Sequence, residues 1–524
     1  MTVRGRTRGV VAAGDSQTAL AGARLLEVGG NAVDAIVAAA FAAFVCELPL
    51  CSPLGGAVML LEEPSGDTHA IDMFARAPGL GSERPSEMDF RGLDVRFGAT
   101  SQTFHVGRAS AAVPLALPGL LDIHARWGRI PLAEVVAPAI AYGRGGFTLG
   151  PVIASILGVL APILAGDPEC RALYATPDAA LGAGQGGTGI SAGALLRNTE
   201  LAGVLEDLAR SPTTLRDVYA AFAREFGTAR GGLVTQEDVD RARITSLSPI
   251  RLTHRGWNVA TMPAPSTGGM LVALGLRLHE GDGAHAFLSR EHLLGVARVQ
   301  EILLEERGRA SLDDTYVEAL RARLAARKAA SPVPDSVLGS TTHLSAIDEN
   351  GLTVALTLTN GEGCGHVLAG TGMLVNNLLG EEDIHPNGFH LDPPGQPLTT
   401  MMAPTILRSG GRRVALGSGG SNRLRNAILQ VLLGLVEHEK DIATAVEAPR
   451  VQIEARTDRT FRLAFEGGGL APDVTSALLA TYPVDPAVFD GPTFFFGGVH
   501  AATASGDTFA GAGDPRRSGA VATV

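Results

Sequence analysis

The sequence predicts an α/β fold in which helices and strands alternate along one globular chain. Apolar runs of strand length, such as 56–61, follow glycine turns, whereas the alanine-rich run 35–45 has the length and composition of a buried helix. Hydrophobic residues make up 45% of the 524 residues, and the mean hydropathy is positive. The length suggests several domains, but large α/β enzymes can keep one continuous core. We therefore expect a large buried core.

The N-terminal elements are expected in a clear order. A strand at 10–13 precedes a helix that Asp15 or Ser16 can cap and that runs through Glu27. Asn31 then opens the alanine-rich helix. Two strands and two helices follow, at 57–61, 68–72, 117–127 and 131–140.

The rest of the chain continues this alternation. Helices are expected at 201–209 and 215–226, and Thr235 with Asp238 resembles a capping box for another. A strand, a proline corner and a helix start span 255–270. The proline-bounded linker 331–335 is where a cleavable loop would lie. Later elements are strands at 372–377, 397–407 and 413–421 and a helix at 424–436.

Charge and apolar patterning exclude two classes of partner. The formal net charge is −11, which gives no electrostatic footprint for nucleic acid. The run 35–45 is much shorter than the ~20 apolar residues that a membrane span needs. The first six residues lack the apolar region of a signal peptide. We expect a cytoplasmic protein without nucleic-acid or membrane partners.

No motif predicts a metal, nucleotide or other cofactor. The four cysteines are too few and too scattered for a disulfide framework, and no CxxC pair suggests zinc. The glycine-rich segment 181–193 is expected to be a loop. It contains a G-x-S-x-G match at 189–193, but no hydrophobic strand precedes it, so the match is attributed to chance. The same glycines fail the dinucleotide fingerprint, and no P-loop motif is present.

The residue with the most specific chemistry is Thr341. It opens a β-rich run, 341–348, that Asn350-Gly351 joins to a second run as a strong hairpin signal. If the peptide bond before Thr341 is cut, its α-amine, with a pKa of about 8, can act as general base for its own hydroxyl. The same Thr-Thr pair can also simply open a strand.

The run Thr341-Thr342-His343-Leu344-Ser345 closely resembles the processing site of the γ-glutamyltranspeptidase family. These are N-terminal-nucleophile hydrolases that cleave themselves before the first threonine. Segments from about residue 8 to the C-terminus resemble the family in the same order, among them 29–35, 255–270 and 514–520. The resemblance implies a four-layer αββα fold. It also implies cleavage between Ser340 and Thr341 into a large subunit, 1–340, and a small subunit, 341–524, that stay together as a heterodimer.

The resemblance also assigns catalytic roles. Thr341 would be the nucleophile that attacks an amide carbonyl and forms an acyl ester. Thr359 matches a threonine that hydrogen-bonds the nucleophile, although alone it could be a strand hydroxyl in solvent. Gly419 and Gly420 match the pair whose N–H groups form the oxyanion hole, where one donor can lower the barrier by roughly 3 kcal/mol. Without the resemblance they would be an ordinary turn.

The substrate-binding positions depart from the family. Its arginine for the glutamyl α-carboxylate falls on Phe74, which cannot bind a carboxylate. Arg76 would share that strand face and could substitute. Thr399 and Thr400 stand where paired serines are expected, and Glu381 best matches the acid that holds the substrate amine.

The sequence therefore predicts a gamma-glutamyltransferase-like or glutathione hydrolase-like enzyme of glutathione metabolism. It would cleave γ-glutamyl or a related small acyl amide through a threonyl acyl-enzyme, without a cofactor. Two alternatives stay open, namely altered acyl specificity, as in oxamate-type amidohydrolases, and a catalytically silent binding homologue. Thr341, Thr359 and Gly419-Gly420 argue against the silent homologue. Cys364 either borders the pocket or is an incidental buried thiol.

Overall fold

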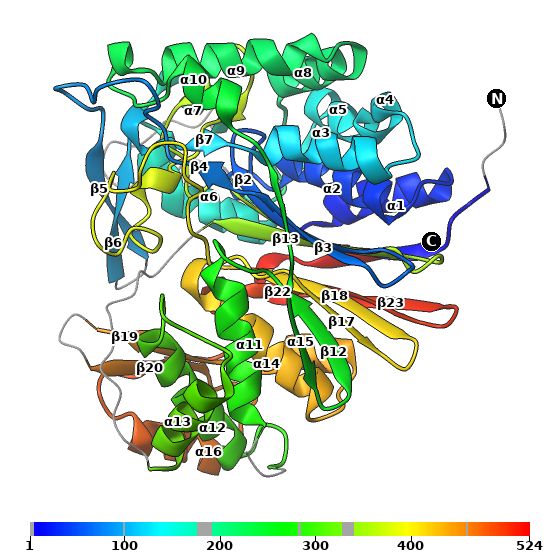
Figure 1. Cartoon of the computed structure of the whole chain (residues 1–524), viewed down its shortest axis with the longest axis vertical. Helices are drawn as coiled ribbons and strands as arrows, with labels where there is room; N and C mark the ends of the chain where they lie inside the picture. The colour runs from blue at the N-terminus through cyan, green and yellow to red at the C-terminus, as the bar shows by residue number, and fades with distance from the viewer. Residues whose placement is uncertain (1–4, 98–99, 175–190, 281–284, 327–339, 457–459) are drawn as a thin grey trace.

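Two β-sheets pack face to face in the computed structural model, and helices cover their outer faces (Figure 1). The structure describes residues 5–97, 100–174, 191–280, 285–326, 340–456 and 460–524. The expected linker 331–335 and most of the expected loop 181–193 lie outside these residues. In the described part, no helix is both long and apolar enough to cross a membrane.

The first sheet brings together strands from both sides of Ser340. Its order is β10-β3-β2-β14-β13-β1-β24. These are β10 (Thr245–Leu247), β3 (Thr68–Met73), β2 (Gly56–Glu62), β14 (Thr353–Thr359), β13 (Thr341–Asp348), β1 (Gly9–Ala13) and β24 (Ala520–Thr523). The predicted hairpin is confirmed as β13 and β14, the antiparallel pair near the centre of the sheet. A cut before Thr341 would leave both pieces hydrogen-bonded within this sheet, since β13 pairs with β1 and β14 with β2.

Helices close the outer face of the first sheet. The innermost is α2 (Ala32–Cys46), and all of its residues are buried, as its alanine-rich sequence predicts. Asn31 caps α2 in a complete capping box, and Asp15 caps α1 (Ser16–Glu27). α3 (Ala116–Trp127) also lies on this side. The helix expected at 131–140 is divided into α4 (Leu132–Val135) and α5 (Ala137–Gly145), because Pro138 has no N–H for a continuous ladder.

The second sheet has the order β11-β12-β17-β18-β22-β23. Its strands are β11 (Ile250–His254), β12 (Trp257–Thr261), β17 (Thr405–Ser409), β18 (Arg412–Gly419), β22 (Gly498–Ser505) and β23 (Thr508–Gly513). α11 (Thr267–His279) and α14 (Leu424–Val436) cover its outer face. On the inner face, β18 and β22 pack against β13, and β18 also packs against β14. The start of the central hairpin therefore lies between the two sheets.

Two predicted strands are much shorter than expected. Only β16 (Met373–Leu374) forms within 372–377, because the N–H of Asn377 donates to the Asn360 carbonyl oxygen instead of a ladder partner and a 3₁₀ turn begins at Leu378. The strand expected at 397–407 begins at Thr405, since Pro397 and Pro404 have no N–H for a ladder.

The remaining elements surround the two sheets. The helices are α6 (Pro151–Leu164), α7 (Pro168–Tyr174), α8 (Thr199–Arg210), α9 (Thr213–Glu225), α10 (Gln236–Arg241), α12 (Arg290–Glu305), α13 (Asp314–Ala325), α15 (Ile442–Glu447) and α16 (Pro472–Thr481). The short strands are β4 (Ala75–Arg76), β5 (Arg91–Phe97), β6 (Thr100–Val106), β7 (Val113–Pro114), β8 (Phe147–Thr148), β9 (Leu195–Leu196), β15 (Val367–Leu368), β19 (Val451–Ala455), β20 (Phe461–Glu466) and β21 (Ala487–Phe489).

Candidate active site

Thr341 and Thr359 face each other at one end of the central hairpin. They form a cross-strand pair, and the Thr341 hydroxyl donates to Oγ1 of Thr359 over 3.2 Å. Thr359 in turn donates to the carbonyl oxygen of Ser340 over 2.6 Å and accepts the N–H of Gly361 over 3.1 Å. All three hydroxyl residues are at least nine-tenths buried. One hydroxyl thus links the predicted nucleophile to the carbonyl group of the bond predicted to be cut.

This arrangement can perform an acyl shift. As Thr341 Oγ1 bonds to the carbonyl carbon of Ser340, the hydroxyl proton can pass through Thr359 to the carbonyl oxygen. The C–N bond then breaks, the proton ends on the freed nitrogen, and an ester joins Ser340 to Thr341. Water can hydrolyse this ester, which restores the threonine hydroxyl beside a free α-amine.

Gly419 ends β18 directly beside Thr341, and Gly420 follows it. A Cβ atom on Gly419 would lie 2.0 Å from the carbonyl oxygen of Thr341, so a side chain has no room there. Gly420 has φ +122°, which glycine adopts readily and L-residues rarely do. The structure therefore places Gly419 against the nucleophile, and Gly420 follows it beside Gly497 and Arg517. The role of Gly419 and Gly420 as oxyanion donors stays a prediction.

Arg517 is a buried cation next to Thr341 and the end of β18. Its Nη1 donates to the carbonyl oxygen of Thr341 over 3.2 Å. Cβ atoms on Gly419 and Gly420 would lie 3.3 and 3.4 Å from its guanidinium nitrogens. Burial lowers the pKa of Arg517 to about 10, which leaves it charged at neutral pH. Arg517 thus holds the Thr341 backbone against the end of β18.

Glu47 lies on the opposite face of the first sheet. Because side chains alternate along β13, Thr342 points away from Thr341 and donates its hydroxyl to Oε2 of Glu47 at the end of α2. Oε1 of Glu47 has no hydrogen-bond partner among the described residues. Burial raises the pKa of Glu47 to about 7. Thr342, the residue after the nucleophile, is therefore hydrogen-bonded to a carboxyl group whose pKa is about 7.

Three acidic residues gather beyond the end of β14. Oε1 of Glu381 would lie 2.5 Å from a Cβ on Gly361. Gly361 is the residue whose N–H binds Thr359. Glu362 is almost fully buried, and Asp383 accepts the hydroxyl of Ser421. Burial, with the neighbouring carboxyl groups, raises the pKa of Glu362 and of Glu381. The structure thus places the predicted amine-binding Glu381 beside Gly361, whose N–H binds the partner of the nucleophile, and Glu362 follows Gly361 directly.

Phe74 and Arg76 occupy very different surroundings. The ring of Phe74 lies over Gly56, where a Cβ would be 2.5 Å from Cδ2, and Gly56 pairs with Thr359. Arg76 is buried and forms an ion pair with Asp72 over 2.9 Å. It also donates to the Arg243 carbonyl and to the Thr245 hydroxyl. These bonds occupy the Arg76 guanidinium at β10, and its predicted role as a substitute carboxylate ligand remains untested.

The other predicted pocket residues lie on neighbouring segments. Thr399 is exposed, and its hydroxyl is 3.4 Å from the Ile384 carbonyl oxygen. Thr400 is buried, and its hydroxyl accepts the N–H of Met402. Their roles as substrate hydroxyls stay a prediction. Cys364 is fully buried in the first core, and burial raises the pKa of its thiol to about 12, so it is an inert thiol.

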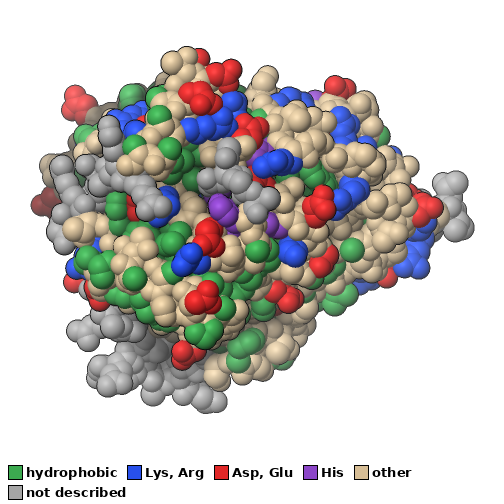
Figure 2. Space-filling view, turned by 90° about the horizontal axis from the view of Figure 1, so that it is seen from below, with side chains coloured by type: hydrophobic (Ala, Val, Ile, Leu, Met, Phe, Trp, Pro, Cys, Tyr) green, Lys and Arg blue, Asp and Glu red, His purple; other side chains and the backbone are tan. Residues whose placement is uncertain are grey.

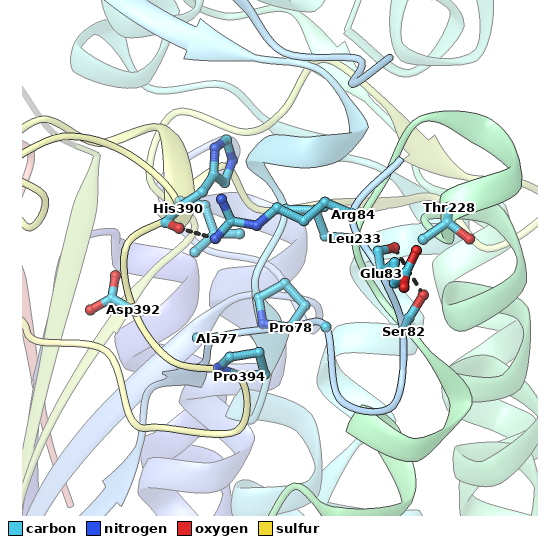
Figure 3. A pocket seen from close by; sticks show the side chains of 12 residues that line it. Ala77, Pro78, Ser82, Glu83, Arg84, Thr228, Leu233, His390, Asp392 and Pro394 are labelled. Carbon is cyan, nitrogen blue, oxygen red and sulfur yellow. Dashed lines mark hydrogen bonds between the residues drawn. The ribbon is translucent and has the colours of Figure 1, made fainter. Parts of the chain in front are cut away.

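A cavity of ≈ 200 Å³ lies where residues of the two predicted subunits meet. Ala77 and Arg84, which precede Ser340 in the chain, line it together with His390 and Asp392, which follow Thr341 (Figure 3). Leu379 is a further lining residue. The Arg84 guanidinium reaches across and donates to the carbonyl oxygen of His390. Ala77 follows Phe74 by three residues, and Leu379 precedes Glu381 by two. The cavity therefore borders both segments that carry predicted substrate-binding residues.

Three site residues have no role in the sequence interpretation: Glu47, Glu362 and Arg517. Arg517 lies in the segment 514–520, which resembles the family. The resemblance of that segment does not by itself assign a role to Arg517. Glu47 directly follows a wholly apolar run, so its burial is the signal that could have identified it. Glu362 stands in the shortened segment after Thr359, where a carboxylate among glycines is a comparable signal.

Charged groups also lie outside this site. No cluster of three or more His, Cys, Asp or Glu with metal-binding geometry occurs within the described residues. Figure 2 shows one face of the molecule, on which acidic and basic side chains are interspersed.

A strand-initial threonine between two sheets, with a second hydroxyl on the preceding carbonyl, defines the class of N-terminal-nucleophile hydrolases. The comparisons agree with this class. Residues 18–524 match the gamma-glutamyltranspeptidase family. The chain therefore belongs to the gamma-glutamyltranspeptidase family and is an autoprocessed hydrolase or acyltransferase.

Individual relatives carry different activities in their names. The chain is 31% identical to the acylase ACY 1 proenzyme of Pseudomonas sp. (strain V22), over 86% of this chain and 83% of that one. It is 26% identical to the glutathione hydrolase proenzyme of Escherichia coli (strain K12), over 84% and 80%. The fold is similar to cephalosporin acylase from Bacillus halodurans, with a TM-score of 0.77 and 22% identity over 99% and 96% of the two chains.

Proposed function

We propose that the chain cuts itself between Ser340 and Thr341 and then hydrolyses or transfers a small acyl group through an ester on Thr341. The observation that carries this proposal is the hydrogen-bonded line from Thr341 through Thr359 to the carbonyl oxygen of Ser340. After the cut, the α-amine of Thr341 can accept the proton of its own hydroxyl. The two stacked sheets and their helices would then be the four-layer αββα unit expected for this class.

The first test compares the intact mass of the purified wild type with that of Thr341→Ala. We expect the wild type to split before Thr341 and the variant to stay at 54.0 kDa. Residues 1–340 and 341–524 should co-purify, because they share the first sheet. A wild type that remains one chain over days would contradict the proposal and favour a silent binding homologue.

The acyl group is proposed to be γ-glutamyl or a related small acyl group with an amine. Glu381 supports an ammonium subsite, because its Oε1 is buried beside Gly361, which binds Thr359, and has no hydrogen-bond partner among the described residues. Phe74 favours altered specificity as the second candidate, because an apolar ring stands where a carboxylate-binding arginine is expected. Of the two acyl substituents, only the amine has a matching group in the described site.

Four p-nitroanilides separate these contributions. The γ-glutamyl compound carries both substituents, 4-aminobutyryl carries only the amine, glutaryl carries only the carboxylate, and butyryl carries neither. We expect 4-aminobutyryl to be cleaved at least as well as γ-glutamyl, and both better than glutaryl. No turnover of γ-glutamyl by a correctly cut protein would remove the γ-glutamyl assignment. A strong preference for glutaryl would contradict the ammonium subsite. The cytoplasmic location and the link to glutathione metabolism stay predictions from the sequence.

A further inference from the structure

Arg517 is a buried cation without a carboxylate partner. It is 5% exposed, and among the described residues no carboxylate forms an ion pair with it. Its neighbours differ in this respect, because Asp514 pairs with Arg450 over 2.6 Å and with Arg516 over 3.2 Å. Burying an unpaired charge is costly. The fold nevertheless places this charge on the nucleophile, since Nη1 of Arg517 donates to the carbonyl oxygen of Thr341.

The α-nitrogen of Thr341 lies close to this cation. The hydrogen bond from Nη1 of Arg517 to the Thr341 carbonyl oxygen is 3.2 Å long. Within one residue of a strand, the nitrogen and the carbonyl oxygen are about 3 Å apart, so the guanidinium lies within roughly 6 Å of the nitrogen that cleavage frees. A Cβ on Gly498 would lie 2.7 Å from Cγ and Cδ of Arg517, so the arginine stem is closely packed against β22. The short separation is therefore a property of the fold.

Carboxyl groups face the hairpin from other sides. Glu47 lies on the opposite face of the first sheet, and Glu362, Glu381 and Asp383 lie beyond the end of β14. Burial raises the pKa of Glu47 to about 7 and also raises the pKa of Glu362 and of Glu381. These shifts favour the uncharged form of each of the three glutamates, which weakens their attraction for an ammonium group.

The other titratable groups between the sheets are neutral or paired. His343 lies two residues after Thr341, and His500 comes from β22. Burial lowers the pKa of both imidazoles, so both are uncharged at pH 7. Arg423 is a second buried cation near Arg517, but it pairs with Glu454 over 2.8 Å. Of these charged groups, Arg517 is the one that is hydrogen-bonded to Thr341 itself.

We propose that Arg517 keeps the freed α-amine of Thr341 uncharged at neutral pH, so that this amine can act as the general base. A positive charge nearby disfavours an ammonium group, and an α-amine otherwise has a pKa of about 8. A downward shift of about one unit brings the base close to the pH at which it works. The inference rests on the proposed self-cleavage. Arg517 acts through the amine and touches no reacting atom, so it is a positioning residue.

The neutral amine is needed when the acyl group is transferred. As Oγ1 of Thr341 bonds to the carbonyl carbon of the substrate, the hydroxyl proton passes to the α-nitrogen. When the C–N bond of the substrate breaks, this proton passes on to the leaving nitrogen, and the amine is neutral again. An amine that is already protonated has no lone pair for the first transfer. Arg517 exchanges no proton, because its pKa of about 10 keeps it charged.

The first test titrates the α-amine of the cut protein. Its labelling by acetic anhydride is measured against pH by mass spectrometry of the peptide that begins at Thr341, after hydroxylamine has removed any acetyl ester. We expect a wild-type midpoint about one pH unit below the ordinary value of about 8.

Three variants separate the charge of Arg517 from its hydrogen bond. Arg517→Gln keeps a donor for the Thr341 carbonyl oxygen but removes the charge, so its midpoint should rise by about one pH unit. Arg517→Lys keeps a charge and should stay close to the wild type. The control Arg216→Met removes an arginine side chain that is 78% exposed on α9, and it should titrate like the wild type.

The second test is the pH profile of kcat/KM for the preferred p-nitroanilide, whose rising limb reports the base in the free enzyme. In Arg517→Gln this limb should move up by about one pH unit, which at pH 7 is a loss of about 5-fold. Above about pH 9 the variant should approach the wild-type rate. A merely structural role would lower the whole profile without moving its limb.

The outcomes separate the two proposals. An uncut wild type overturns the proposed function itself. A wild type that cuts but has a midpoint of 8 or above overturns only the role of Arg517, as does an Arg517→Gln variant with an unchanged midpoint. If Arg517→Gln fails to fold or to cut, Arg517→Met replaces it as the uncharged variant, and the wild-type midpoint decides by itself if both fail.

Discussion

Thr359 donates its hydroxyl to the carbonyl oxygen of Ser340 over 2.6 Å. Oγ1 of Thr359 also accepts the hydroxyl of Thr341 and the N–H of Gly361. A single side chain therefore polarises the carbonyl to be attacked and orients the attacking group. Its geometry is set by the register of the hairpin, in which Thr341 and Thr359 are direct partners.

Replacing Thr359 should consequently impair the cut more than the fold. Thr359→Val keeps the shape and β-branching but loses the donor to Ser340, so cleavage should slow by about 10²-fold, as for loss of one donor to a developing oxyanion. Thr359→Ser keeps the hydroxyl and should cut within about 10-fold of the wild type. Time courses on denaturing gels measure both rates. Equal rates for Val and wild type would show that Thr359 takes no part.

The contact between β18 and Thr341 gives a second prediction. Gly419→Ala places a Cβ 2.0 Å from the Thr341 carbonyl oxygen, so the two backbones must separate. We expect cleavage and turnover to be lost while far-UV circular dichroism stays close to wild type. The control is Gly203→Ala in α8, where nothing lies within 4 Å of the new Cβ. That variant should keep full activity and gain up to about 1 kcal/mol of stability. Normal cutting by Gly419→Ala would contradict the close approach.

The hairpin and its nucleophile could be predicted because their signals are local. Asn350-Gly351 specifies a turn, and the runs on either side have strand composition. Once paired, they place Thr341 opposite Thr359. The buried α2 was likewise predictable, since its sequence is apolar on every face.

The contacts of the other residues around the site were harder to predict, because segments that are distant in the sequence position them. Period-two alternation predicts which face Arg76 occupies, but not that Asp72 and the distant Thr245 hold its guanidinium. The turn that carries Glu362 is fixed by Asn377, from another segment, which accepts the N–H groups of Glu362 and Gly363. Arg517 is far from Thr341 in the sequence and meets it only when β22 packs on β13.

Arg76 offers a test that separates stability from substrate binding. Its ion pair with Asp72 is buried, so Arg76→Met leaves a carboxylate without its partner and should lower the free energy of unfolding by about 3–5 kcal/mol. Denaturant unfolding measures this loss. KM for the preferred p-nitroanilide should stay unchanged where the variant is folded. The double variant Asp72→Asn with Arg76→Met should recover much of the loss. A raised KM with unchanged stability would instead identify Arg76 as a substrate ligand.

Glu47 should make stability depend on pH in an unusual direction. Burial at the end of α2 raises its pKa from the ordinary 4.5 to about 7. Because the folded state then binds more protons than the unfolded state, the contribution of Glu47 to stability is full below pH 4.5 and is lost as pH rises to about 7.

Glu47→Gln mimics the protonated carboxyl and still accepts the hydroxyl of Thr342. Relative to the wild type it should gain stability between pH 5 and 8, reaching at most about 3 kcal/mol, whereas other titrating groups cancel in the difference. Urea unfolding in the uncut Thr341→Ala background, read by tryptophan fluorescence, measures this at each pH. Glu27→Gln, an exposed change at the end of α1, should run parallel to the wild type. A Glu47→Gln curve that also runs parallel would mean that Glu47 stays ionised behind the nucleophile.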